Sequence, residues 1–590
     1  MKFNIYCLFA AFTATFLGLS SCVTINEELG GNFIPTDQTW SVYPCDPVLL
    51  KDITIRKAEN LTGYSTSRIT FGSIKDGKFS SKKASSFTLV PLMDTLDFGT
   101  DTKVLQFHFT ASRDTLSTIN DRDVKMLQNV LVRPLKKALD STILYASDNN
   151  LLNEFVHMDS TITAGIPVYN GGDSLSFDFS EEYALEVIEG IKQWQSLQKP
   201  ERDSLKYYLE KVPGIYIETD GQSDEGGRIN MFNLPMATSD GYIDANYAEL
   251  KIRAYYNGST EPTDTLFVFY FGPSEFIKEG ATSYPSQYAF NSSENLVDEA
   301  FIREWENQEA PAELFVEGGS GFKPVVKAAE IKELVSGLIE DKAKEKGEEI
   351  DPSTVVINKA TIILPYNVGS DYESLSRYPQ VLSPTVRLVS DDEKYVTYAG
   401  LTDSSIESEN QGNINLSLSR YQPDLSHHIQ EIVKLKKGSG EDVDPNETDE
   451  EFIKRLEKYD IWFLIMHEET QTSSSSGSAY DDYYNSLMYN SYYNNMMYDP
   501  YGYGYGYGGY GGYGYGGYGY GGYGDYYGYN NYYNYYMMAA YANASSSSST
   551  TTSSMELDRD RFYNARLNGP GATSDKPCLK ITFSAPKKAE

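Results

Sequence analysis

Leu250–Phe271 (LKIRAYYNGSTEPTDTLFVFYF) is the stretch that decides the fold class. Its first six residues alternate apolar Leu250, Ile252 and Ala254 with polar or charged neighbours, the period-two pattern of a half-buried strand. Its last six residues form an apolar run suited to a sheet interior. Leu105–Thr110 shows the same alternation. Further strand patterns occur at residues 214–219, 354–365, 386–388, 413–418, 459–466 and 579–583.

Helical patterns are fewer and lie between these strands. They cover residues 180–198, 201–211, 328–346 and 426–437. Many short strands with few helices favour a mainly β protein over a doubly wound sheet. We therefore predict two antiparallel β-sandwich (jelly-roll-like) domains, the first at residues 40–240 and the second at residues 241–590.

One segment has the composition of a disordered loop. Residues 480–541 hold 25 of the 49 tyrosines of the chain, and Ser/Thr tracts flank them. Because every register of such a repeat is equivalent and glycine is costly to order, the segment cannot select one packed core. We predict a long Ser/Tyr/Gly-rich insertion at residues 473–554, inside the second domain.

The N-terminus has the features of a lipoprotein signal. Lys2 precedes an apolar stretch at residues 5–19, which is too short to span a bilayer comfortably. The stretch ends in Leu19-Ser-Ser-Cys22, which looks like the lipobox of bacterial lipoproteins. We predict a signal peptide at residues 1–21, acylation of Cys22, and a polar tether over residues 22–39. An ordinary cleaved signal, with Cys22 incidental, is the alternative.

The charge balance restricts the partners. The chain has 50 Lys and Arg against 83 Asp and Glu, a net charge of −33. This is opposite to the balance of a nucleic-acid-binding protein, and it disfavours attraction to an anionic membrane surface. The acyl chains on Cys22 would then be the contact with the membrane.

The remaining cysteines allow one disulfide. Cys7 leaves with the signal and Cys22 takes lipid, so Cys45 and Cys578 form an even pair in an oxidising compartment. We predict that they are bridged, with two unrelated buried thiols as the alternative.

No catalytic motif of the G-x-S-x-G, Walker A or H-E-x-x-H type occurs. Gly318-Gly-Ser-Gly321 is interpreted as a turn between strands. His427 and Glu431 are four residues apart, a spacing that could hold a metal ion, and His428 is adjacent to His427. Because no further ligand is evident, a solvated helix face is the better interpretation. Residues 441–451 are acidic, but they lack the glycine and glutamate of a calcium loop. We predict no catalytic residue, no metal site and no cofactor.

Six blocks along the chain resemble a known family. They are Phe71–Lys78, Leu131–Asp140 with Tyr145, Gly214–Ile217, Ile252–Tyr256, Phe315–Gly321 with Ile357–Ala360, and Leu579–Thr582. In this order they are similar to the secreted lipoproteins of Bacteroidetes grouped as domain of unknown function 4270. The resemblance implies a secreted lipoprotein location and a β-rich fold, and it brings no activity. The Tyr/Gly insertion departs from the family pattern.

Three function classes fit these observations. The first is a non-catalytic lipoprotein of the cell envelope, at the outer membrane, whose β-scaffold has a binding or adhesive role. The second is a glycan-capturing surface lipoprotein of a polysaccharide-uptake system, because tyrosine rings stack on sugars and make protein contacts at low entropic cost. The third is an unrecognised hydrolase.

Overall fold

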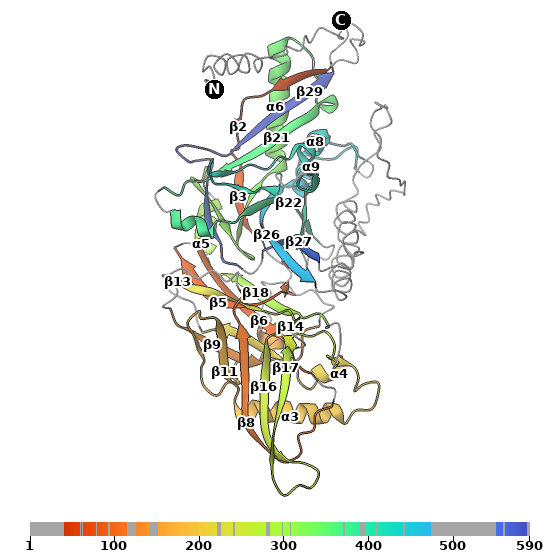
Figure 1. Ribbon diagram of the computed structural model, residues 1–590. Coiled ribbons are helices and arrows are strands. Elements are labelled where there is room, and N and C mark those ends of the chain that lie inside the picture. The colour runs from red at the N-terminus through yellow and green to blue at the C-terminus, as the bar shows by residue number, and fades with distance from the viewer. Residues whose placement is uncertain are drawn as a thin grey trace, which may run out of the picture.

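The computed structural model describes residues 40–586, except for positions 59–60, 62, 66, 78, 93–94, 115–125, 141–151, 221–225, 240–241, 279–283, 298, 307, 309, 370–371, 390–395, 407–410, 441–442, 474–549 and 559–560. The chain is mainly β, as predicted, and the paired strands of the described residues are antiparallel. Figure 1 shows two β-rich halves stacked along a long axis. We call them the lower and the upper sandwich.

The lower sandwich consists of residues 64–295 and has two sheets. An eight-stranded sheet contains β4 (Tyr64–Ser65), β5 (Arg68–Asp76), β6 (Phe79–Phe87), β9 (Gln128–Pro134), β10 (Val168–Tyr169), β12 (Ile215–Thr219), β13 (Gly226–Asn233) and β18 (Ala289–Asn295). A five-stranded sheet has the order β11 (Ser174–Asp178), β8 (Thr100–Ser112), β16 (Tyr247–Tyr255), β17 (Thr263–Phe271), β7 (Leu89–Pro91). Outside these sheets lie α2 (Leu152–Phe155), α3 (Glu181–Gln195), α4 (Leu205–Leu209), β14 (Ala237–Ser239) and β15 (Tyr242–Asp244).

Stacked phenylalanines fill the core between these two sheets. The ring of Phe109 lies 4.5 Å from that of Phe177 and 4.7 Å from that of Phe271, and Phe87 of the opposite sheet lies 5.2 Å from Phe271. The alternation at residues 250–255 is therefore confirmed, since Leu250, Ile252 and Ala254 are buried. At residues 105–110 it holds for Phe107 and Phe109, but Leu105 is 36% exposed, because a bulge shifts the register of β8 against β16 between residues 104 and 106. Helix α3 begins at the predicted cap, where the Ser180 side chain accepts from the Tyr183 N–H.

The upper sandwich is assembled from both ends of the described chain. One sheet contains β1 (Trp40–Pro44), β2 (Val48–Leu49), β21 (Val356–Pro365), β24 (Ile414–Asn415), β25 (Arg420–Tyr421) and β29 (Cys578–Pro586). A second contains β3 (Ile53–Lys57), β20 (Phe322–Val326), β22 (Val381–Val389), β23 (Val396–Gly400), β26 (Ile461–Ser473) and β27 (Thr550–Leu557). Strand β19 (Glu313–Glu317) pairs with β28 (Asn564–Asn568).

Helical segments pack around this half. They are α5 (Glu299–Glu306), α6 (Ala328–Lys346), α7 (Thr402–Ile406), α8 (Ser426–Lys434), α9 (Asp449–Leu456), η3 (Pro352–Thr354), η4 (Tyr372–Arg377) and η6 (Glu457–Tyr459). Helix α6 covers the predicted range and ends where Gly347 adopts a φ of +67°, a left-handed conformation that favours glycine. The Lys332 ammonium of α6 donates to two carbonyls at the end of α8, which joins the two helices.

The domain boundary that we predicted near residue 240 is wrong. Strand β16 pairs with β8, and β18 pairs with β6, so residues 247–295 belong with strands that precede residue 240. Conversely, β3 pairs with β20 and β1 pairs with β29, so the strands of residues 40–57 belong with strands that follow residue 320. Hydrophobic alternation identifies strands, but it does not state which strands pair, and for this reason the sequence misplaced the boundary.

The ends of the predicted insertion also differ from expectation. Strands β26 and β27 pair from Met466 opposite Leu557 to Ser473 opposite Thr550, so residues 550–554 lie in a strand and not in a loop. Threonine-rich segments suit a strand because threonine is β-branched. Residues 474–549, which include the whole Tyr/Gly repeat, lie outside the described residues.

Candidate functional site

Cys22, the predicted lipid attachment site, lies outside the described residues. Cys45 and Cys578 lie within them and are free thiols, so the predicted disulfide is wrong. The Cys45 N–H donates to the carbonyl of Ile581, three residues along β29 from Cys578. At about 3.3 Å per residue this offset is about 10 Å, beyond the Cα separation of a disulfide. An odd offset also places the two side chains on opposite faces of β29.

The two histidines at the start of α8 are only partly solvated. His428 is buried on α8, where Nε2 lies 2.9 Å from the carbonyl oxygen of Tyr459, and burial lowers its pKa to about 4. The Asp403 carboxylate accepts from the N–H groups of His427 and His428 at 2.7 and 3.0 Å. These residues therefore fix the start of a helix. We had interpreted them as a solvated helix face, which is wrong for His428.

The end of the acidic run, residues 448–451, forms the start of a helix. Thr448 and Glu451 form a capping box at the start of α9, and Asp449 and Glu450 occupy its first turn. Negative charge at this end is stabilising because it complements the helix dipole. Among the described residues, no group of three or more His, Cys, Asp or Glu could hold a metal ion.

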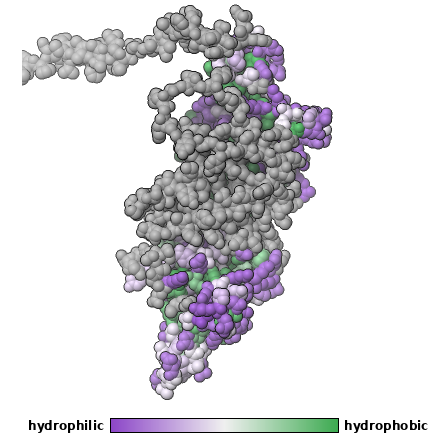
Figure 2. Space-filling model, turned by 90° about the vertical axis from the view of Figure 1, so that its right-hand side faces the viewer, coloured by the Kyte–Doolittle hydropathy of each residue, from purple (hydrophilic) through white to green (hydrophobic). Residues whose placement is uncertain are grey.

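Three of the four tryptophans, Trp194, Trp305 and Trp462, are buried, but Trp40 is 43% exposed at the start of β1. His108 is part-exposed on the outer face of the five-stranded sheet, where its Nδ1 lies 2.7 Å from Oδ1 of Asp178. Arg253 and Asp264 form a two-contact pair on the same sheet. In Figure 2 the coloured surface of the lower sandwich is mainly hydrophilic, with apolar residues in small patches.

The β26–β27 hairpin is the structural base of the Tyr/Gly segment. Eight consecutive pairs join the two strands, and the last pair is Ser473 with Thr550. The two ends of residues 474–549 therefore leave the fold side by side. Figure 1 shows β26 and β27 adjacent, at the end of the upper sandwich that faces the lower one. The arrangement makes the segment a loop presented by a folded hairpin.

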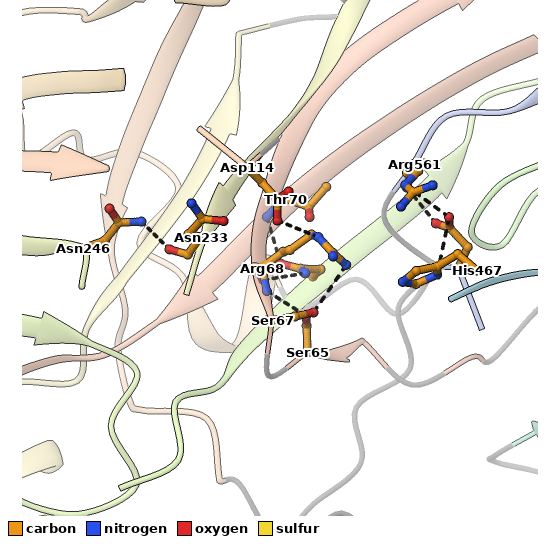
Figure 3. A network of polar contacts seen from close by, with 11 residues as sticks. Ser65, Ser67, Arg68, Thr70, Asp114, Asn233, Asn246, His467 and Arg561 are labelled. Carbon is orange, nitrogen blue, oxygen red and sulfur yellow. Dashed lines mark hydrogen bonds and ion pairs between the residues drawn. The ribbon is translucent and has the colours of Figure 1, made fainter. Parts of the chain in front are cut away.

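A buried charge network anchors this hairpin. Asp558 follows β27 directly and is 2% exposed. Its carboxylate accepts from the Tyr563 hydroxyl at 2.7 Å and from the Arg561 N–H at 3.0 Å, and Nδ1 of His467 lies 3.6 Å away. Figure 3 shows His467 and Arg561 of this network close together. Burial by itself would raise the pKa of Asp558, but the positive charges of His467 and Arg561 and the Tyr563 hydroxyl hold that pKa below its usual value.

A second group of buried polar residues lies where the two halves meet. The predicted turn Gly318–Gly321 is confirmed, since it connects β19 to β20. It docks on the lower sandwich: the Ser320 hydroxyl donates to the Ser293 carbonyl of β18 at 2.6 Å. Lys83 of β6, Glu317 and Lys323 are each no more than 2% exposed at this point. We call these residues, with Ser293 and Asn295, the junction cluster.

Lys323 and Glu317 differ in how completely their charged groups are hydrogen-bonded. The Lys323 ammonium donates to the carbonyls of Glu317, Gly319 and Gly321, at 2.5, 3.0 and 3.0 Å. Glu317 accepts through Oε2 from the side-chain amide of Asn295, while its Oε1 has no hydrogen-bond partner. Burial raises the pKa of Glu317 to about 8 and lowers the pKa of Lys323 to about 7. Such shifts mark a candidate site for proton chemistry.

Sequence reasoning did not single out Lys83, Lys323 or Asp558. Lys83 lies in the polar stretch Phe79–Phe87 (FSSKKASSF), which has no apolar alternation, although both faces of β6 are largely buried. The one available signal was Gly318–Gly321, a glycine-rich turn with a glutamate before it and a lysine after it. Close packing leaves no space for a side chain at two of the glycines in this turn. A Cβ at Gly319 would lie 2.3 Å from Ser293 Oγ, and one at Gly321 would lie 2.6 Å from Glu317 Oε2.

Within the part of the chain that the structure describes, none of the helices is long and apolar enough to cross a membrane. The comparisons with known proteins add no relative. No family model matches the chain, and neither the curated proteins nor the solved structures contain a match.

Proposed function

We propose that this chain is a non-catalytic lipoprotein of the cell envelope, attached to the outer membrane through acylated Cys22, that presents its Tyr/Gly-rich loop for binding or adhesion. The observation that carries the proposal is the β26–β27 hairpin, which brings both ends of residues 474–549 to one place. A buried network at Asp558 holds that hairpin. The likeness to the lipoproteins grouped as domain of unknown function 4270 supports the same location.

Tyrosine suits such a role. Its ring offers a flat apolar surface with a hydrogen-bonding tip, and two rotatable bonds keep the entropic cost of ordering low. The segment holds 25 tyrosines and no Lys or Arg. Contacts with a partner are therefore expected mainly from rings, hydroxyls and backbone, and salt bridges from the segment are limited to its four aspartates.

The test removes the Tyr/Gly-rich loop and joins β26 directly to β27 by a short turn. Residues 474–549 are replaced by Asn-Gly between Ser473 and Thr550, because a two-residue turn of this type fits an antiparallel pair. A matched variant keeps the loop length but changes the 25 tyrosines to serine. Both are compared with the unaltered protein for binding to cell and host surfaces and on a glycan array. We expect both variants to lose adhesion while retaining the circular dichroism of the parent.

The other outcomes identify the competing functions. Sugar binding that both variants lose would support the glycan-capturing alternative, and sugar binding that both retain would place a glycan site on the described β-sandwiches. Turnover of a polysaccharide would show a hydrolase. Adhesion unchanged by loop removal would overturn the proposal.

The lipid anchor has a separate test. Cys22→Ala removes the acyl acceptor, so we expect the protein to move to the soluble fraction or to retain its signal peptide. Two or more acyl chains are needed for stable attachment, since one chain binds only marginally. Membrane partitioning and processing identical to those of the unaltered protein would contradict the anchor.

A further inference from the structure

The junction cluster places a lysine and an asparagine on one face of two neighbouring strands. Strands β6 and β18 are antiparallel, with Lys83 opposite Ser293 and Ser81 opposite Asn295. Residues two apart on a strand share a face, so Lys83 and Asn295 are diagonal neighbours. Cβ atoms of diagonal neighbours are about 7–8 Å apart or less, within reach of a lysine side chain.

A buried carboxyl group lies against the same pair. The Asn295 side-chain amide donates to Glu317 Oε2, and its Oδ1 accepts from the Val297 N–H at 3.0 Å, which fixes the plane of the amide. Lys83 is near enough to Glu317 for its charge to act on that carboxyl. Its Nζ would lie 3.1 Å from a Cβ at Gly319, so the absence of a side chain there leaves room for the amine.

We propose that Lys83 and Asn295 form an intramolecular isopeptide bond, with Glu317 as the proton-transfer group. The Lys83 ammonium gives a proton to the Glu317 carboxylate, and the neutral amine attacks Cγ of Asn295. A bond forms between Nζ and Cγ, and the bond from Cγ to Nδ2 breaks. Glu317 takes up the second amine proton as it returns the first to the departing nitrogen, which leaves as ammonia. Nothing is oxidised or reduced, and no co-reactant is needed.

The surroundings favour each step. Burial raises the pKa of Glu317, which favours the neutral form that can donate a proton to the departing nitrogen. A low-dielectric site favours the neutral forms of a lysine and a carboxyl over their ions, and a neutral amine is the nucleophile. Holding the two side chains on one face of paired strands replaces a bimolecular encounter and removes much of its barrier. Lys83 is the nucleophile because it lies on β6, which pairs with the strand that carries Asn295, whereas Lys323 lies on β20 of the upper half.

The bond would fasten the sheet where the two halves meet. It would join β6 to β18 and close the chain between residues 83 and 295, almost the whole lower sandwich. A protein without a disulfide among its described cysteines would thereby gain a covalent link. The inference concerns the scaffold and does not depend on the proposed function.

Peptide mapping of the full-length protein tests it. Trypsin cannot cleave after a lysine whose amine is an amide, so the bond predicts a branched peptide that joins residues 83–103 to residues 279–303. Its mass would be about 17 Da, one ammonia, below the sum of the two linear peptides. The unaltered protein is compared with Lys83→Met, Asn295→Ala and Glu317→Gln, and with Lys82→Met as the control on the opposite face of β6.

We expect the branched peptide in the unaltered protein and in Lys82→Met, where its first arm begins at residue 79 because the cleavage site at residue 82 is gone. We expect its loss in the other three variants. Glu317→Gln matters most because glutamine keeps the shape and the neutrality of the protonated carboxyl, so the variant stays folded but cannot relay protons. Circular dichroism checks the fold of each variant. Linear peptides 84–103 and 279–303 in full yield from the unaltered protein would overturn the bond. A branch at Lys323 would overturn the assignment of Lys83.

Discussion

The two sandwiches are built from similar strands in different ways. The lower one uses a single run of chain, residues 64–295, and its core contains many aromatic rings, some of them stacked, among aliphatic side chains. The upper one needs β1–β3 from the start of the described chain and β28–β29 from its end, and isoleucine, valine and leucine make up much of its core. The upper half also carries the hairpin from which the Tyr/Gly segment leaves.

The difference suggests that the two halves have different roles: the lower half closes its own core, and the upper half carries the connections to the predicted anchor and to the loop. A run of chain that closes its own core can form independently of the chain ends, whereas the upper half closes only when distant segments meet, at an entropic cost. The segment that leads to Cys22 joins β1 of the upper half. The upper half thus connects the folded scaffold to its predicted anchor and its loop, and the lower half is the rigid extension.

The largest effect should come from Phe109→Ala in the lower core. Phe109 is 1% exposed and stacks on Phe177 and Phe271, so its truncation should cost about 3–5 kcal/mol. Hydrogen exchange measured by mass spectrometry should rise in β8, β16 and β17, and remain low in β21 and β29. Leu105→Ala, on the same strand at an exposed position, is the control. An equal rise in both halves would mean that they unfold as one unit.

A second substitution tests the stability of the upper half. Asp558→Ala leaves His467, Arg561 and Tyr563 without their shared carboxylate, and we expect a loss of about 3 kcal/mol in urea unfolding. Exchange should increase at β26 and β27 before it does in the lower sandwich. Asp264→Ala, which removes one partner of the exposed pair with Arg253, should change stability little. A loss confined to the lower half would contradict the role given to Asp558.

Asp558 also predicts an acid limit. Its folded pKa lies below the unfolded value of about 3.9, so its contribution is present above that pH and is lost as the pH falls toward the folded pKa. Melting curves between pH 5 and pH 2.5 should therefore converge for the unaltered protein and Asp558→Ala. Curves that stay parallel down to pH 2.5 would contradict the shift.

The junction between the halves should show the opposite pH dependence. The folded pKa of Glu317, about 8, lies above its unfolded value of about 4.3, so the contribution of this group is present below pH 4.3 and declines as the pH rises toward 8. As the pH rises from 5 to 7, the unaltered protein should therefore lose stability relative to Glu317→Gln. Above pH 7, Lys323 contributes with the opposite sign, because its pKa is lowered. A stability difference between the two proteins that is independent of pH would contradict the raised pKa of Glu317.

The smallest effect should come from reductant. Because Cys45 and Cys578 lie apart as free thiols, dithiothreitol should leave the mass and the melting temperature unchanged. Both thiols should react with maleimide after denaturation without reductant. A gain of about 2 Da on reduction would show a disulfide after all.

Local pattern predicted most of the elements but not their partners. Alternation at residues 105–110 and 250–255 identified two strands, and the capping serine at residue 180 identified α3, because both signals depend on near neighbours in the sequence. The pairing of β16 with β8 and of β1 with β29 depends on contacts between distant segments. The predicted boundary near residue 240 and the predicted disulfide were wrong for this one reason.

The charged residues show the same limit. A buried lysine, glutamate or aspartate looks like a surface residue in the sequence, since only the fold removes it from water. Lys83, Glu317 and Asp558 were therefore invisible as candidates until β18, β19 and β27 were in place. His428 was misread for the same reason.

By itself, the sequence determined the β-rich class, the position and composition of the Tyr/Gly segment, and the lipoprotein-like N-terminus, because each is written in a short run of residues. The tertiary structure alone decided which strands share a sheet, that the segment leaves from a closed hairpin, and that Lys83, Asn295 and Glu317 meet. Those features arise from segments that are far apart in the chain and become neighbours when apolar faces are buried together.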